Sequence, residues 1–298
     1  MSYIGRFAPS PTGPLHFGSL VAAAGSYLHA RAAGGQWLLR IEDVDTERNV
    51  PGAEAEILRA LVAYGFAWDG AVLRQTTRLD AYAAALEALR RAGRVFGCAC
   101  SRSEIERAAL AARLPRAVDG GLVYPGTCRA GLPAGCVARA WRLRVPDPGA
   151  DQIAFDDALQ GRRVQHLASA VGDFVLKRAD GPYAYQLAVV VDDAFQGVTD
   201  VVRGADLIDS TPRQIWLQRC LGVPTPRYLH LPVALDAAGQ KLSKQTRAAP
   251  LDLGQVGPTL WAAFAFLGLR LPAELRQAPP PELWSAALAA TRAHGFTG

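Results

Sequence analysis

The sequence predicts an α/β protein built on a parallel β-sheet. A strand at about residues 3–8, a helix at 18–33 and a strand at 37–41 follow one another at the N-terminus. Such a β-α-β unit implies a parallel sheet with a right-handed crossover. The same alternation returns after about residue 149. The chain has 298 residues, half of them hydrophobic, which suits one large domain or two smaller ones with a sizeable core.

Proline and glycine mark the ends of the first elements. The prolines of residues 9–14 cannot continue the first strand, since each removes a backbone donor, and Gly34-Gly35 ends the first helix. The strand at 37–41 is apolar enough to be buried on both faces. Helices are expected at 51–64, with Pro51 at the first helical position, and at 78–92.

The middle of the chain has a different character. From Cys98 to about Pro148 it is rich in cysteine, glycine and proline, with one short helix expected at 103–112. Beyond it we expect strands at 185–191, 198–203 and 228–235, and helices at 211–221, at 258–269 and after the three prolines at 279–281. Ser210 is expected to cap the helix at 211–221, with Pro212 in its first turn.

Composition narrows the class of protein. A net charge of +5 and a pI of about 9.1 permit nucleic-acid binding without requiring it. The N-terminus has no signal-peptide pattern, and the apolar stretch 18–33 is too short and too polar to cross a bilayer. We therefore expect a soluble, cytoplasmic protein without membrane contact. The five cysteines, an odd and unevenly spaced set, do not indicate a disulfide framework.

Two short segments carry phosphate-binding chemistry. His16-Phe17-Gly18-Ser19 opens the first helix, where free N–H groups and the helix dipole favour a phosphate. Only three of the 32 basic Lys and Arg residues are lysines, and two of them lie in Lys241-Leu242-Ser243-Lys244-Gln245. A lysine pair on a loop can clamp a polyphosphate. Taken alone, the first segment is better explained by a helix-capping histidine and the second by a solvated loop.

Together these segments resemble the HIGH and KMSKS signatures of the class I aminoacyl-tRNA synthetases. Residues 6–13 (RFAPSPTG), 40–45 (RIEDVD) and 202–207 (VRGADL) resemble the glutamyl branch, and the resemblance runs from about Tyr3 to Leu253. The departures are Phe17 and Ser19 in the first signature and Leu242 in the second. None of these positions must supply a polar group.

The resemblance implies a Rossmann-type class I catalytic core that activates glutamate with Mg²⁺-ATP. The implied catalytic residues are His16, Gly18, Lys241 and Lys244, and those implied for ATP are His16, Gly18, Ser243 and Lys244. Glutamate would contact Arg6, Ser10, Glu42, Tyr185 and Arg203. Glu42 follows a buried strand, and the resemblance places it against the substrate ammonium. Two arginines that can each fork onto a carboxylate suit a substrate with two carboxylates.

The cysteine-rich segment predicts a structural zinc site. Cys98, Cys100 and Cys128 can face one ion, and zinc prefers such soft ligands. Cys136 is chemically the natural fourth ligand, whereas resemblance to one glutamyl-type subfamily favours Tyr124. Reduced, unpaired thiols are the alternative to a metal site. Cys220 is expected to lie in the core.

The acceptor is inferred from resemblance as well. The segment after Lys244 is too short for a separate anticodon-reading domain. With the cysteine–tyrosine pattern, this resembles the glutamyl-queuosine tRNA(Asp) synthetases, which transfer glutamate to the queuosine base at the wobble position of tRNA(Asp). Two alternatives stay open: a truncated glutamyl-tRNA synthetase that charges the acceptor end, and a catalytically silent protein that binds tRNA or glutamate as a regulator. No obligate protein partner is evident.

These inferences divide the chain into four segments. Residues 1–97 and 149–253 are expected to form the two halves of the catalytic domain. Residues 98–148 form a zinc-binding, acceptor-type insertion, and 254–298 form a short helical C-terminal segment.

Overall fold

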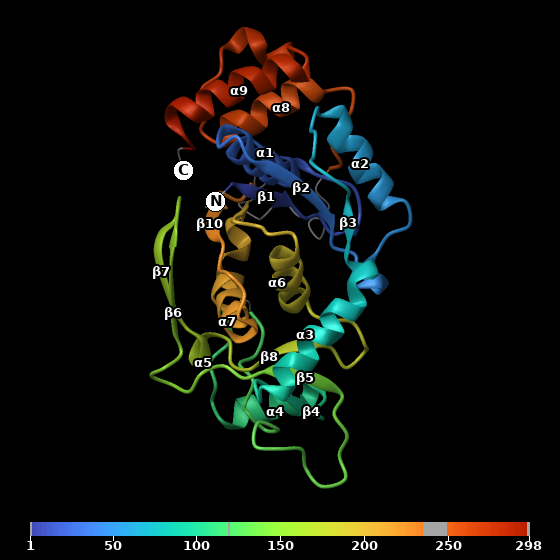
Figure 1. The fold of residues 1–298 in the computed structure, drawn as a ribbon, viewed down its shortest axis with the longest axis vertical. Helices are drawn as coiled ribbons and strands as arrows, with labels where there is room; N and C mark the ends of the chain where they lie inside the picture. Colours follow the sequence, from blue (N-terminus) through green and yellow to red (C-terminus); the bar gives the residue numbers. More distant parts are fainter. Residues whose placement is uncertain (1, 119, 235–248, 297–298) are drawn as a thin grey trace.

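The computed structural model describes residues 2–118, 120–234 and 249–296. Figure 1 shows an elongated molecule, with β1 (Ile4–Phe7) and β2 (Gln36–Ile41) in its upper half and β4 (Val95–Cys98) near its lower end. No helix in the described part of the chain is long and apolar enough to cross a membrane.

The N-terminal β-α-β unit is confirmed. β1 pairs with β2 in parallel, and β2 pairs in parallel with β3 (Leu73–Arg74). Helix α1 (Phe17–Ala32) connects β1 to β2. It ends where Gly34 takes a positive φ of 65° and the Gly35 N–H donates to Ala30 O at 2.9 Å. Glycine adopts this left-handed conformation without steric cost, so the chain turns directly into β2.

A second sheet continues the parallel arrangement. Its order is β7 (Gly161–His166), β6 (Gln152–Asp157), β10 (Arg227–Leu231) and β9 (Asp200–Gly204). β9, β10 and β6 are parallel, while β6 and β7 form an antiparallel hairpin. The Thr199 N–H donates to Ile4 O at 2.9 Å, which joins the start of β9 to β1. The strands from both halves of the chain therefore meet beside α1.

A third sheet is antiparallel and was not predicted. It has the order β4, β5 (Ala140–Leu143) and β8 (Phe174–Lys177). Helix α4 (Arg102–Ala111) follows β4, starting from a capping box between Ser101 and Glu104. Short strands without clear alternation are difficult to recognise, because a short apolar run suits a strand or a buried helix equally well.

The C-terminal helices extend the core of the N-terminal sheet. α8 (Val256–Phe266) and α9 (Pro280–His294) pack on α1, as Figure 1 shows at the top of the molecule. Leu260, Phe264 and Leu283 are fully buried there, and each such side chain contributes roughly 1.5 to 3 kcal/mol of burial free energy. The Trp284 indole N–H also donates to Tyr64 O, at the end of α2 (Ala53–Ala63).

The predicted strand at 185–191 is wrong, because this segment is helix α6 (Tyr185–Phe195). Its three consecutive valines favour a strand locally. In the fold, α6 packs against α3 (Leu79–Arg91) and α7 (Thr211–Leu221), and Leu187 to Val190 are buried. Tertiary packing overrides the local preference, and the helix directs Asp193 at the buried Arg40 and Asp192 at the partly buried Arg78.

One predicted capping position is confirmed and another is wrong. Ser210 is the N-cap residue of α7, although its side chain makes no capping hydrogen bond to this helix and its hydroxyl accepts from Gln186. Pro51 lies before α2, and Gly52 with φ 82° takes the N-cap position. The prediction of Pro212 in the first turn of α7 is confirmed. The predicted strand at 228–235 is β10, and residue 235 lies outside the described residues.

Candidate active site and metal centre

A cavity of about 420 Å³ lies at the carboxyl ends of β1, β9 and β10. Open α/β sheets bind ligands at this edge, because the loops that follow parallel strands converge there. Its lining includes seven residues that sequence reasoning assigned to glutamate or ATP: Arg6, Ser10, His16, Gly18, Glu42, Tyr185 and Arg203. Lys241, Ser243 and Lys244 lie outside the described residues.

The N-terminus of α1 forms one wall of the cavity. His16 is the N-cap of this helix, with extended backbone angles, and its Nδ1 accepts from the Ser19 N–H at 3.3 Å. Since Nδ1 is the acceptor, the proton of the neutral ring is on Nε2, which can donate to a ligand. Gly18 in the first turn lets a ligand approach the backbone closely. The capping and phosphate-binding interpretations of His16 are therefore compatible.

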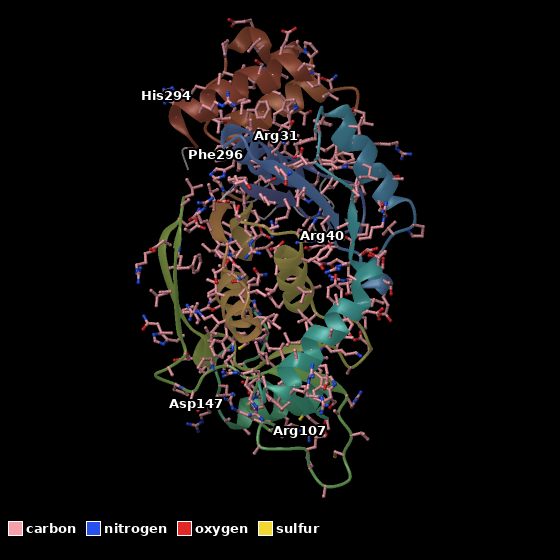
Figure 2. The ribbon with its side chains drawn as sticks, viewed as in Figure 1. Arg31, Arg40, Arg107, Asp147, His294 and Phe296 are labelled. Atoms are coloured by element: carbon pink, nitrogen blue, oxygen red, sulfur yellow. The ribbon has the colours of Figure 1, made fainter. Side chains whose placement is uncertain are left out.

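A buried ion-pair network includes Arg6 and Glu42, which line the cavity. Arg6 forks onto Asp193, with Nε to Oδ1 at 3.0 Å and Nη2 to Oδ2 at 3.3 Å. Arg40, fully buried, donates to Asp193 at 2.8 Å and to Glu42 at 3.3 Å. Figure 2 labels Arg40 between the β1–β2 sheet and α6. Two arginines thus face two carboxylates, which balances charge where an isolated charge would be costly.

The pKa values of the two carboxyl groups in this network shift in opposite directions. Burial raises the pKa of Glu42, although Arg40 and Arg6 oppose the rise. Burial also acts on Asp193, but the two arginines hold its pKa below the ordinary value. The Arg6 fork, predicted for a substrate carboxylate, is made with Asp193, so only the remaining guanidinium hydrogens of Arg6 are left for a ligand.

Arg203, in β9, also lines the cavity. Its Nε donates to His230 Nε2 at 3.1 Å, and its Nη2 donates to Thr211 Oγ1 at 2.8 Å. Its Nη1 lies 3.3 Å from the Tyr185 hydroxyl. The guanidinium plane is therefore held from behind and from the side before any ligand arrives, which lowers the entropy cost of binding one.

Sequence reasoning missed several residues that support this cavity: Arg40, Asp157, Asp193, Thr211 and His230. A signal was present for some of them. Arg40 and His230 lie within apolar strands, and Asp193 is the second of two aspartates that follow an apolar run. A charged or polar residue in a buried element needs a buried partner.

The three predicted cysteines come together at the end of β4. The sulfurs of Cys98, Cys100 and Cys128 lie within 4.8 Å of one another. A tetrahedral zinc ion with bonds of about 2.3 Å needs sulfurs about 3.8 Å apart. The Tyr124 hydroxyl lies 3.4 Å from Cys98 Sγ and accepts from the Cys128 N–H at 2.9 Å. Three thiol sulfurs and a phenol oxygen fit zinc chemistry, whereas Cys136 is exposed.

A cation favours ionisation within this cluster. The Arg142 guanidinium lies 3.9 Å from the centre of the Tyr124 ring. Burial raises the pKa of Cys98, but hydrogen bonds from Tyr124 and Arg142 lower it below its ordinary value. Burial and the two neighbouring thiols raise the pKa of Cys100 to about 11. The cluster lies at the end of β4, and Figure 1 shows β4 and α4 at the opposite end of the molecule from α1.

Comparison with known proteins defines the class. Residues 4–259 match the family described as tRNA synthetases class I (E and Q), catalytic domain. The chain belongs to this family, and it is a ligase. The match covers the cavity and the cysteine cluster.

Individual relatives agree with this family. "Glutamyl-Q tRNA(Asp) synthetase" of Dechloromonas aromatica is 62% identical over 95% of this chain and 92% of its own length. The protein of that name from Aromatoleum aromaticum is 58% identical, over 95% and 86%. The resemblance to glutamyl-queuosine tRNA(Asp) synthetases is thereby confirmed.

A solved structure matches the fold. That of the glutamate-tRNA synthetase from Elizabethkingia anophelis superposes with a TM-score of 0.77 at 25% identity and covers 95% of this chain. The chain spans 65% of the length of that protein, which is less than two thirds.

Proposed function

We propose that this protein activates L-glutamate with ATP to form glutamyl-adenylate and transfers the glutamate to queuosine at the wobble position of tRNA(Asp). The observation that carries the proposal is that one cavity combines the N-terminus of α1, two arginines and Glu42. A helix N-terminus suits a phosphate, and the charged side chains suit an amino acid with a second carboxylate.

The glutamate would be held by its three charged groups. Glu42 binds the ammonium, while Arg203 and the remaining hydrogens of Arg6 bind the two carboxylates. Ser10 and Tyr185 line the same cavity and complete these contacts. Because Arg203 is already oriented by its neighbours, its hydrogen bonds are preorganised for the substrate.

The first step is a phosphoryl substitution. A glutamate α-carboxylate oxygen attacks the α-phosphorus of ATP in line, the bond to the bridging oxygen breaks, and pyrophosphate leaves. His16 Nε2–H and the backbone at Gly18 bind the nucleotide, and Lys241, Ser243 and Lys244 stabilise the charge that moves to pyrophosphate. Mg²⁺ enters with ATP and neutralises phosphate charge.

The second step is acyl transfer. A hydroxyl of the queuosine cyclopentenediol attacks the adenylate carbonyl, an ester bond forms, and AMP leaves with the bonding electron pair. The hydroxyl proton passes to the leaving phosphate or to solvent. No nucleophilic side chain is required, so catalysis comes from positioning and charge stabilisation. The choice of queuosine as acceptor is supported by the names of the two relatives, since the chain aligns with most of the length of each.

The test is transfer of labelled glutamate, with ATP, to two tRNA(Asp) preparations that differ only in queuosine. Label on the modified tRNA alone supports the proposal. Label on the acceptor end of tRNA(Glu) would instead identify a truncated glutamyl-tRNA synthetase. Absence of glutamate-dependent pyrophosphate exchange would identify a catalytically silent binding protein.

We propose one structural zinc ion per chain, held by Cys98, Cys100, Cys128 and Tyr124. The donor set and the short separations support this assignment, because soft thiolate ligands select zinc. The ion would connect β4 to the loop that precedes β5 and would take no part in the chemistry.

Zinc content measured by elemental analysis is expected to be one per chain in the wild type. Cys128→Ser is expected to lose it, and Tyr124→Phe to bind zinc more weakly in a competition with a chelator. Cys136→Ser is the matched control and is expected to keep the ion at wild-type affinity. Loss of zinc from Cys136→Ser, with Tyr124→Phe unaffected, would make Cys136 the fourth ligand.

The affinity for glutamate is expected to depend on pH through Glu42. Its pKa is raised by burial, so the ionised form that binds an ammonium is present above this raised pKa and is lost as pH falls through it. The KM for glutamate in pyrophosphate exchange should therefore rise at a pH above the ordinary glutamate value of 4.5. A KM that stays constant down to that pH would contradict the assignment of Glu42.

A further inference from the structure

A buried chain of polar side chains continues behind Arg203, away from the cavity. His230, in β10, accepts from Arg203 Nε at its Nε2, and its Nδ1 lies 2.6 Å from Asp157 Oδ2. The side chains of His230 and Asp157 are both 0% exposed. The partners come from three neighbouring strands of one sheet, β9, β10 and β6.

The hydrogen bonds define the tautomer of His230. An arginine Nε can only donate, so His230 Nε2 must be unprotonated, and the single ring proton is on Nδ1, where it is donated to Asp157. Burial lowers the pKa of His230, and Arg203 lowers it further, while Asp157 opposes both. An imidazole whose Nε2 accepts from Arg203 is neutral, and the lowered pKa agrees with this geometry.

The second oxygen of Asp157 has a separate role. Its Oδ1 accepts from the backbone N–H groups of Leu159 at 3.1 Å, Gln160 at 2.8 Å and His230 at 3.2 Å. Two of these donors belong to the turn between β6 and β7 and the third belongs to β10, and together they hold one carboxylate oxygen in place. Oδ2 is left to face the histidine, so the turn and the histidine are oriented by the same carboxylate.

We infer that Asp157 and His230 are positioning residues for Arg203. Asp157 keeps the proton of His230 on Nδ1, so that Nε2 accepts from Arg203 and holds its guanidinium towards the glutamate cavity. The inference rests on the proposed function, since it assumes that Arg203 binds a carboxylate of glutamate. Neither Asp157 nor His230 lines the cavity, so both act through Arg203.

The conservative variant Asp157→Asn tests the inference sharply. Three backbone N–H donors keep the amide oxygen at the position of Oδ1, so the amide NH₂ replaces Oδ2. His230 Nδ1 must then accept, and its proton moves to Nε2. Thr211 Oγ1, which lies 3.2 Å from His230 Nε2 and accepts from Arg203 Nη2, can accept this new Nε2–H, whereas the Arg203 Nε–H then faces an N–H and loses its acceptor. A carboxylate next to a histidine controls its tautomer in the same way in other enzymes.

His230→Gln is the second variant. The glutamine side chain has a carbonyl oxygen that can accept from Arg203, and it has no tautomers that Asp157 could control. Asp157→Asn is expected to raise the KM for glutamate roughly 10- to 100-fold, the range of a hydrogen bond to a charged group. The KM for ATP should stay near that of the wild type. In the His230→Gln background, Asp157→Asn should cause little further loss, because no tautomer is left to invert.

Asp151→Asn is the matched control. Asp151 is buried beside β6, accepts from the Gly149 and Ala168 N–H groups, and lies 3.4 Å from His166 Nδ1. His166 is 57% exposed and has no contact with Arg203 among the described residues. This control should keep the KM for both substrates.

The ring nitrogens of His230 provide a readout independent of activity. Their chemical shifts, assigned by comparison with His230→Gln, should show a protonated Nδ1 in the wild type and a protonated Nε2 in Asp157→Asn. Unchanged nitrogen shifts, or an unchanged KM for glutamate in Asp157→Asn, would overturn the inference. Equal changes in the KM for ATP and glutamate would show a general structural defect and would overturn it too. A wild type without glutamate-dependent exchange would reject the proposed function, while the nitrogen shifts would still test the tautomer.

Discussion

Replacing Glu42 by glutamine is expected to raise the KM for glutamate in pyrophosphate exchange by more than about 100-fold, equivalent to about 3 kcal/mol. The glutamine keeps a carbonyl oxygen for Arg40, which lies 3.3 Å from Glu42 in the wild type. It removes the negative charge that would pair with the substrate ammonium in a nearly buried site. The ammonium is then desolvated without a counter-charge, which costs more than loss of a hydrogen bond.

The matched control for this variant is Glu54→Gln. Glu54 also pairs with an arginine, Arg74 at 2.6 Å, but on the surface of α2 and outside the cavity lining. We expect its KM values for glutamate and ATP to match those of the wild type. If Glu42→Gln bound glutamate as well as the wild type, the ammonium site would have to be elsewhere in the cavity.

Replacing Asp193 by asparagine is expected to lower the free energy of unfolding by about 3 to 5 kcal/mol. Asp193 is the carboxylate that both Arg6 and Arg40 contact, and the side chains of these arginines are 4% and 0% exposed. Its removal leaves two positive charges and only Glu42 in the buried network. Urea unfolding followed by circular dichroism measures the change.

Asp156→Asn is the control for Asp193→Asn. Asp156 pairs with Arg162, but the two side chains are 78% and 67% exposed, so water replaces the lost contact. No measurable change in the unfolding midpoint is expected. If Asp193→Asn had the same urea midpoint of unfolding as the wild type, Arg6 and Arg40 would have to find other counter-charges.

The local features of the site were predictable from sequence because each depends on neighbours along the chain. One short segment contains the proline-rich turn, His16 at the start of α1, and Gly18. The cysteine pair at 98 and 100 is similar, since two ligands separated by one residue lie close in any fold. Residue type and spacing carry such information directly.

The partners of these residues were not predictable, because they come from distant segments. Arg6 pairs with Asp193, which is 187 positions away, and His230 pairs with Asp157, which is 73 positions away. The first pair requires that 185–195 form a helix against the sheet, whereas local preference indicated a strand. The second requires that β6 lie beside β10, although no strand was predicted at β6.

The sequence by itself predicted the α/β class and the cysteine group, which follow from residue type and short spacing, and its resemblance to the glutamyl branch supplied the residues proposed for ATP and glutamate. The tertiary structure alone decided which charges are paired, how Arg203 is held and that α6 is helical. Burial is the physical reason: a charged or polar side chain removed from water must find its partner wherever packing brings one within hydrogen-bond distance.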